Sequence, residues 1–201
     1  MDTEIQKSRV RTDRVSCPSP HSRWNKIGRI VWQFVWLLAF RLSPWFWQAP
    51  RRGLLRLFGA QVGQGVQVMP SVKIWGPWNL VLGDHATVSH GVDLYCVDKI
   101  SIGAHATVSQ RAFLCTATHA IDHPNMPLVT KPIYISDGAW VAAEAFVHPG
   151  VTVGVDAVVG ARAVVVKDVA ARDVVTGNPA RVVRARSCHF CGGTPGSYPE
   201  K

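Results

Sequence analysis

The stretch ISDGAWVAAEAFVHPGVTVGVDAVVGARAVVVKDV at residues 135–169 repeats an aliphatic side chain at every sixth position, at Ile135, Val141, Val147, Val153, Val159 and Val165. Toward the N-terminus the same spacing continues, with a long break before Ile135 and a two-residue slip before Ile102, through Leu82, Val88, Leu94, Ile102, Val108 and Leu114. Four positions after most of these residues comes a compact Ala or Val. A fixed period of this kind predicts a repeat architecture.

A six-residue unit is long enough for one short strand and one tight corner, with the aliphatic side chain pointing inward. Three units make one triangular coil, and stacked coils bury a continuous aliphatic column that no single coil could form alone. The sequence therefore predicts an all-β fold, a parallel β-helix of hexapeptide repeats over residues 59–186 with an inserted loop at 120–131. An antiparallel sandwich would instead alternate with a period of two, which is not seen.

Residues 24–58 form an apolar and basic segment for which we expect one or two helices, the first over 24–42. In the second helix we expect three arginines to point outward, namely Arg51, Arg52 and Arg56. The apolar residues Leu54, Leu55 and Phe58 should point inward. The uninterrupted apolar part is too short to span a bilayer, so the segment should dock on the coil or touch a membrane surface peripherally. Residues 1–23 and 187–201 are predicted to be flexible.

The net charge of +9 is unevenly distributed along the chain. Residues 1–58 hold eleven Lys and Arg against three Asp and Glu, whereas residues 59–179 hold seven against nine. Because a nucleic-acid-binding fold would carry its positive charge on its body, we expect no nucleic-acid partner. The five cysteines are odd in number and scattered, and we expect no cleaved secretory signal, which favours a cytoplasmic location, with peripheral membrane contact at the inner face as an option.

Three stretches together resemble the hexapeptide-repeat O-acetyltransferases: IGAHATVSQRAFLCTATHAIDHP at 102–124, the repeats at 135–169 and VTGNPARVVRAR at 175–186. The similarity is greatest to colanic-acid-type acetyltransferases of exopolysaccharide biosynthesis, and it also covers galactoside and maltose acetyltransferases over about residues 80–185. The resemblance implies a left-handed coil and a homotrimer with acetyl-CoA bound between neighbouring subunits. It further implies O-acetyl transfer to a hydroxyl of a saccharide or saccharide precursor, with no metal.

The resemblance also implies roles for individual residues. A sugar hydroxyl needs a base to remove its proton as it attacks the thioester, and histidine changes charge nearest neutral pH. His119, at the break in the repeat within CTATH, matches the catalytic histidine of the family. His90 and Asp93 stand where relatives contact the acceptor. The residues that match the coenzyme A contacts are Trp140, Ala142, Ala143, Ala161, Val166, Lys167, Arg181 and Arg184.

Two alternatives remain open at this stage. A β-helical carbonic anhydrase would bind zinc through three histidines, and His85, His119 and His123 have a spacing near that pattern. A β-helix can also serve as a non-enzymatic scaffold, which would not bind coenzyme A. The pair Cys188 and Cys191 in the tail is only half of a zinc site.

Overall fold

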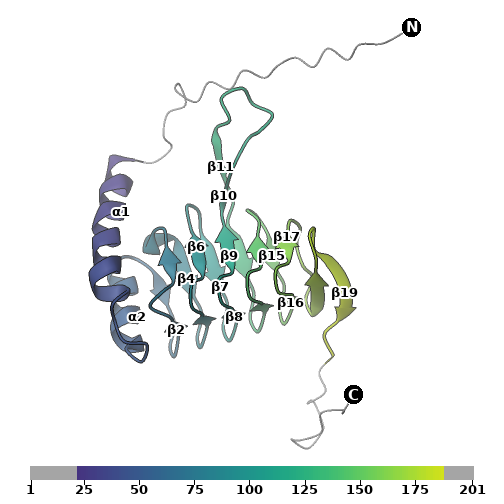
Figure 1. The fold of residues 1–201 in the computed structure, drawn as a ribbon, viewed down its shortest axis with the longest axis horizontal. Coiled ribbons are helices and arrows are strands. Elements are labelled where there is room, and N and C mark those ends of the chain that lie inside the picture. Colours follow the sequence, from purple (N-terminus) through teal and green to yellow (C-terminus); the bar gives the residue numbers. More distant parts are fainter. Residues whose placement is uncertain (1–21, 188–201) are drawn as a thin grey trace, which may run out of the picture.

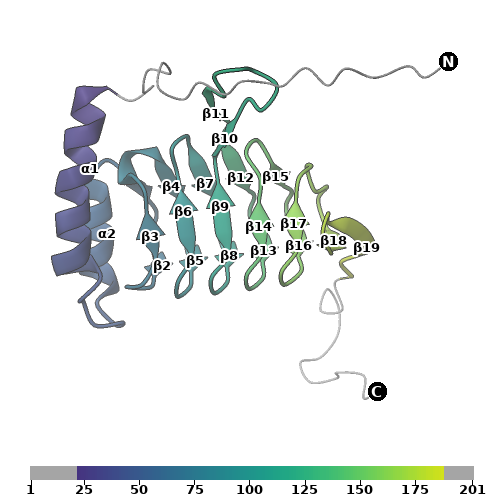
Figure 2. The ribbon, with the colours of Figure 1, turned by 45° about the horizontal axis from the view of Figure 1, so that its top comes forward.

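The computed structural model describes residues 22–187 of the 201-residue chain. The lead up to residue 21 and the tail from residue 188, with Cys188 and Cys191, lie outside the described residues. Two helices stand at one end of a prism of short strands, and a hairpin projects from the middle of the prism (Figures 1 and 2). The described residues contain no helix that is both long and apolar enough to cross a membrane.

The prism is a parallel β-helix with three sheets, one for each side of its triangular coil. The first sheet holds β1 (Gln61–Val62), β4 (Leu80–Leu82), β7 (Ile100–Ile102), β12 (Ile133–Ile135) and β15 (Thr152–Val153). The second holds β2 (Gln67–Val68), β5 (Thr87–Val88), β8 (Thr107–Val108), β13 (Trp140–Val141), β16 (Val158–Val159), β18 (Asp173–Thr176) and the antiparallel β19 (Arg181–Ala185). The third holds β3 (Lys73–Ile74), β6 (Asp93–Tyr95), β9 (Phe113–Cys115), β14 (Phe146–Val147) and β17 (Val164–Val165).

The predicted aliphatic residues stack in register along these sheets. In the second sheet the aligned inward residues are Val68, Val88, Val108, Val141, Val159 and Val175. All twelve members of the six-residue series, from Leu82 to Val165, are at most 2% exposed. The hexapeptide β-helix is therefore confirmed. The structure also contains an earlier coil, β1 to β3, that the series did not include.

The corners of the coil need unusual backbone geometry or very close approach. Gly103 shows the second requirement, because a Cβ there would lie 2.3 Å from Asp137 Oδ1 and 2.6 Å from its amide nitrogen. Other corners adopt positive φ at residues other than glycine, among them His85, His105, Arg111, Glu144 and Arg162. Left-handed backbone, which is uncommon for residues other than glycine, is thus adopted here by side chains of many types.

The N-terminal helices close the open end of the coil. Backbone N–H groups of each coil donate to carbonyl groups of the following coil, as Gln67 does to Ala86. First-coil carbonyl groups such as those of Val66 and Val68 occupy the positions that accept from a preceding coil, and no coil precedes them. Buried carbonyls without a partner are costly, so donors must come from elsewhere.

Helix α1 (Arg23–Val35) and the one-turn π-helix η1 (Trp36–Phe40) supply indole donors to this open edge. Trp32 Nε1 donates to the Ile74 carbonyl and Trp36 Nε1 to the Val72 carbonyl, both at 2.8 Å. The Trp32 side chain is fully buried against Phe40 and Phe58. The indoles therefore contribute both apolar packing and the missing hydrogen bonds.

Helix α2 (Gln48–Leu57) supplies guanidinium donors, and here the expectation of an outward Arg51 was wrong, whereas Arg56 is exposed as expected. Arg51 is 1% exposed and donates from Nε to the Val68 carbonyl at 2.8 Å. Arg52 donates to the Val66 carbonyl and Arg56 to the Val62 carbonyl. Burial lowers the pKa of Arg51. Arg51 points inward because the carbonyl groups at the open edge of the coil need hydrogen-bond donors.

An antiparallel hairpin interrupts the coil after β9. It consists of β10 (Ala117–His119) and β11 (Leu128–Thr130), and it stands clear of the prism in both views (Figures 1 and 2). Its base is fixed because the Lys131 N–H donates to the Thr116 carbonyl, and the buried Thr116 hydroxyl donates to the Tyr95 carbonyl. The expected loop at 120–131 thus corresponds to the tip and second strand of a paired hairpin.

Candidate active site

His119 ends strand β10, on the projecting hairpin, and its side chain is exposed. Its Nδ1 lies 2.7 Å from the carbonyl oxygen of Met126 on the other side of the hairpin. A carbonyl oxygen can only accept a hydrogen bond, so in this contact Nδ1 carries the proton. In the neutral ring, Nε2 then holds the lone pair and is available as a base.

A second feature is a cavity of about 440 Å³ between α1 and the third sheet. Lys73 and Asp93 line it together with the aromatic side chains of Trp36, Trp75 and Tyr95. Partial burial raises the pKa of Asp93, and the charge of nearby Lys73 opposes this in part. Aromatic faces beside a few polar groups form a typical small-ligand site.

His90 does not line this cavity. It stands at the corner before β6, where its Nδ1 lies 3.1 Å from the Ser71 hydroxyl. The two residues predicted to contact the acceptor are therefore placed differently, with only Asp93 at the cavity.

The residues predicted to bind coenzyme A fall into two groups. Trp140, Ala142, Ala143 and Ala161 lie on the second sheet and at the corner that leads to the third sheet. The Trp140 side chain is 47% exposed, and its Nε1 donates to the Ser109 hydroxyl at 2.8 Å. The backbone N–H groups of Ala143 and Ala161 have no hydrogen-bond partner among residues 22–187. This edge thus offers an aromatic surface and free donors beside small side chains.

The second group lies toward the C-terminal end of the prism. Val166, Lys167 and Arg181 line a cavity of about 280 Å³. Lys167 and Arg181 are exposed, and together with Asp168, which also lines this cavity, they leave its mouth with a net positive charge. Arg184 lies on β19 but does not line the cavity, and its guanidinium donates to the Ala185 carbonyl.

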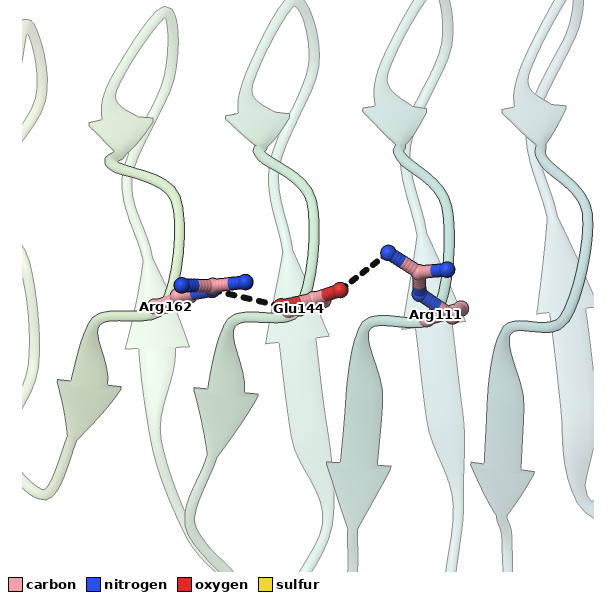
Figure 3. Close-up of polar contacts among 3 residues, drawn as sticks. All are labelled: Arg111, Glu144 and Arg162. Carbon is pink, nitrogen blue, oxygen red and sulfur yellow. Dashed lines mark hydrogen bonds and ion pairs between the residues drawn. The ribbon is translucent and has the colours of Figure 1, made fainter.

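Sequence reasoning missed a row of charges beside the first group. Glu144 bridges Arg111 of the preceding coil and Arg162 of the following coil, as Figure 3 shows. Both arginines hold the pKa of Glu144 below its ordinary value. The three residues occupy equivalent positions in successive coils, and each has positive φ. Their spacing of 33 and 18 residues reflects the inserted hairpin, which hides the alignment in the sequence.

One copy of the chain does not bring all these residues together. The hairpin with His119 leaves the prism at the corner between the third and first sheets, where Val166 and Lys167 also lie two coils further on. Trp140, Ala143 and Ala161 lie at the corner between the second and third sheets instead. The predicted site is therefore divided between two edges of the prism.

The zinc alternative finds no support in the arrangement of the histidines. His85 stacks on His105 at 5.1 Å between ring centroids, at the corner between the first and second sheets. His119 and His123 belong to the hairpin on a different corner. Among the described residues, no three His, Cys, Asp or Glu side chains are grouped so that they could hold a metal ion.

Comparison with known proteins gives relatives and structures but no matching family model. A protein of Escherichia coli (strain K12) named as a proposed colanic acid biosynthesis acetyltransferase, WcaF, is 43% identical over 171 residues, covering 85% of this chain and 94% of the relative. The galactoside O-acetyltransferase of the same strain is 27% identical over 137 residues, covering 67% and 68%. A hexapeptide-repeat acetyltransferase of Vibrio cholerae, solved with acetyl-coenzyme A, superposes with a TM-score of 0.77 at 26% identity, covering 85% and 93%.

Proposed function

The chain belongs to the hexapeptide-repeat acetyltransferases, and from that premise we propose that it moves an acetyl group from acetyl-CoA to a hydroxyl of a saccharide in polysaccharide biosynthesis. The observation that carries the proposal is the contact of His119 Nδ1 with the Met126 carbonyl. It fixes the tautomer in which Nε2 can accept a proton.

In the proposed reaction, the acceptor hydroxyl attacks the carbonyl carbon of the thioester while its proton passes to Nε2 of His119. The tetrahedral intermediate then expels the coenzyme A sulfur as the C–S bond breaks. The leaving sulfur takes the proton back from the imidazolium, so the histidine returns to its neutral form. General-base assistance of this kind typically contributes about 10² to 10⁴ in rate.

The residues present fit acetyl-CoA as co-substrate. The free N–H groups of Ala143 and Ala161 suit the amide carbonyls of the pantetheine arm, since small side chains let another chain approach the backbone. The cationic mouth formed by Lys167 and Arg181 suits the phosphate groups. The coenzyme would present the thioester carbon, and the protein would orient it.

For the acceptor, the cavity beside Asp93 offers what a sugar ring requires. Carboxylate and ammonium groups can bond hydroxyls, while Trp36, Trp75 and Tyr95 offer apolar faces for the C–H side of the ring. His90 remains a second proposed contact, at the neighbouring corner.

The divided site supports a homotrimer. Because His119 and the Trp140 group lie on different edges of one prism, a second copy placed alongside can complete the site with its own edge. Closed rotational symmetry then gives three equivalent sites.

Release of coenzyme A against a panel of nucleotide sugars and lipid-linked saccharides tests the function. We expect one acceptor class to drive release, and NMR of the product should show an O-acetyl ester. Light scattering should give a mass of three 22.0 kDa chains. Failure of acetyl-CoA to raise the melting temperature, together with no release for any acceptor, would overturn the proposal.

A further inference from the structure

The two helices and η1 form a helical cap, residues 22–58, whose outer face is apolar. Among the described residues, twelve of the nineteen exposed large hydrophobic side chains lie in this cap. Phe34 is 63% exposed and Ile30 is 56% exposed, and the full set is Trp24, Ile27, Ile30, Val31, Phe34, Leu37, Leu38, Leu42, Trp45, Phe46, Trp47 and Leu57. A surface of this extent is unusual on a monomeric soluble protein.

Packing on the coil does not explain these residues. The inner face of α1 and η1 already donates hydrogen bonds to the coil through Trp32 and Trp36, and Gly28 lies close to Trp78 there. Ile27, Ile30 and Phe34 lie on the opposite face of the same helix, following its turn of 3.6 residues. In both views α1 lies at the end of the prism, with the coil on one side only (Figures 1 and 2).

The charge of the cap indicates the nature of its partner. Residues 22–58 contain seven Lys and Arg and no Asp or Glu. Arg51, Arg52 and Arg56 serve the coil edge, but Arg23, Lys26 and Arg41 are exposed on the same part of the chain as the apolar residues. Cationic side chains around an apolar face with exposed tryptophans are typical of helices that lie in the headgroup region of a bilayer.

We propose that the outer face of the helical cap docks on the surface of an anionic lipid bilayer. The apolar side chains of α1 enter the boundary between headgroups and acyl chains, while Arg23, Lys26 and Arg41 contact lipid phosphates. Docking is peripheral, since the described helices are too short to span. The surface lies apart from His119 and the Trp140 group, so docking does not require acetyl transfer.

The trimer proposed above adds to this binding. Three prisms packed through their sides leave their ends uncovered and bring three caps to one end of the ring. Linked binding units gain affinity because the second and third contacts become intramolecular. The site would then be held near saccharides presented at a membrane surface.

The test is co-sedimentation of the full chain with vesicles of phosphatidylcholine, with and without about one-third phosphatidylglycerol. We expect binding to the anionic vesicles that weakens as salt screens the charges. The variant Ile30→Gln/Phe34→Gln should lower the partition coefficient about tenfold or more, and Lys26→Gln/Arg41→Gln should lower it about tenfold. The matched control is Val155→Gln, because Val155 is 48% exposed at a corner of the coil.

A second measurement uses the wild-type protein alone, so its result does not depend on whether the variants fold. Brominated lipids in the anionic vesicles should quench tryptophan fluorescence, because Trp24, Trp45 and Trp47 are exposed on the cap. The proposal is overturned if the wild-type chain neither sediments nor is quenched, or if Val155→Gln loses as much binding as the cap variants. It is also overturned if the wild type does not bind vesicles and Ile30→Gln/Phe34→Gln lowers the mass of the assembly in light scattering. A second copy of the chain would then cover the outer face of the cap.

Discussion

The indole Nε1 of Trp140 donates a hydrogen bond of 2.8 Å to the hydroxyl of Ser109 on the preceding coil. The bond fixes the orientation of a large aromatic side chain that is half exposed beside Ala142 and Ala143. We expect Trp140→Leu to raise the dissociation constant for acetyl-CoA by up to about tenfold, since an aromatic contact is worth about 0.5 to 1.5 kcal/mol.

Ser109→Ala should raise the dissociation constant less, by about two- to fivefold, because it removes the hydrogen bond that orients the indole but leaves the indole in place. Titration of acetyl-CoA by calorimetry measures both. A larger effect for Ser109→Ala than for Trp140→Leu would contradict this role for the indole.

Asp93→Asn should stabilise the protein at neutral pH and weaken acceptor use. Burial raises the pKa of Asp93 above 3.8, so the ionised form is disfavoured in the folded state. The wild-type protein therefore loses stability as the pH rises through the folded pKa of Asp93. The gap in melting temperature between variant and wild type should therefore close as the pH falls below about 3.8. In assays, the KM for the acceptor should rise while the KM for acetyl-CoA stays unchanged. An equal rise of both constants would argue against acceptor contact.

Glu144→Gln should lower thermal stability slightly at neutral pH by removing both ion pairs of the ladder in Figure 3. The arginines depress the pKa of Glu144, so its contribution is present above pH 4.5 and is lost as the pH falls through the folded pKa. Because both arginine side chains are exposed, salt should reduce the difference, which melting curves at about 0.1 M and about 1 M salt can test. A difference that does not shrink as the pH falls further below 4.5 would show a cause other than charge.

Substitutions at two glycines, Gly103 and Gly53, test the close packing of the coils and provide a matched control. Gly103→Ala should lower the free energy of unfolding by about 1 to 3 kcal/mol, because the added methyl group would overlap the backbone of Asp137 in the next coil. Gly53→Ala should raise it by about 0.5 to 1 kcal/mol, since nothing lies within 4 Å and the residue is inside α2. Urea unfolding measures both, and stabilisation by Gly103→Ala would contradict the close packing of the coils.

Most of the coil could be predicted because one rule governs it. A residue such as Val141 must be aliphatic since it faces the axis, and its partners Val108 and Val159 obey the same constraint at a regular spacing. The series of twelve began at Leu82, yet Val62, Val68 and Ile74 of the first coil keep the same six-residue spacing and are followed by a two-residue slip like the one before Ile102.

The cap and the site were harder to predict because their contacts are distant in sequence. Periodicity suggests that Arg51 faces solvent. In the structure its guanidinium points inward and donates to the Val68 carbonyl, 17 residues away in the sequence. The ladder of Arg111, Glu144 and Arg162 depends on coil register across the hairpin. The contact between His119 and Met126 depends on how that hairpin pairs, which the spacing of the repeats does not encode.

His119 is the residue on which the proposed chemistry depends most, and its replacement should spare the fold. The side chain lies on an exposed hairpin outside the aliphatic column, and the proposed coenzyme A contacts come from other strands. A suitable control is His105→Ala, since His105 is also exposed but stacks on His85 at another corner of the coil.

The decisive measurement is the rate of acetyl transfer by folded His119→Ala at saturating acetyl-CoA, with the acceptor found in the saccharide panel. We predict a fall in kcat of about 10² to 10⁴, with acetyl-CoA binding retained and His105→Ala close to wild type. Activity of His119→Ala within about threefold of wild type would contradict the assignment of His119 as the base.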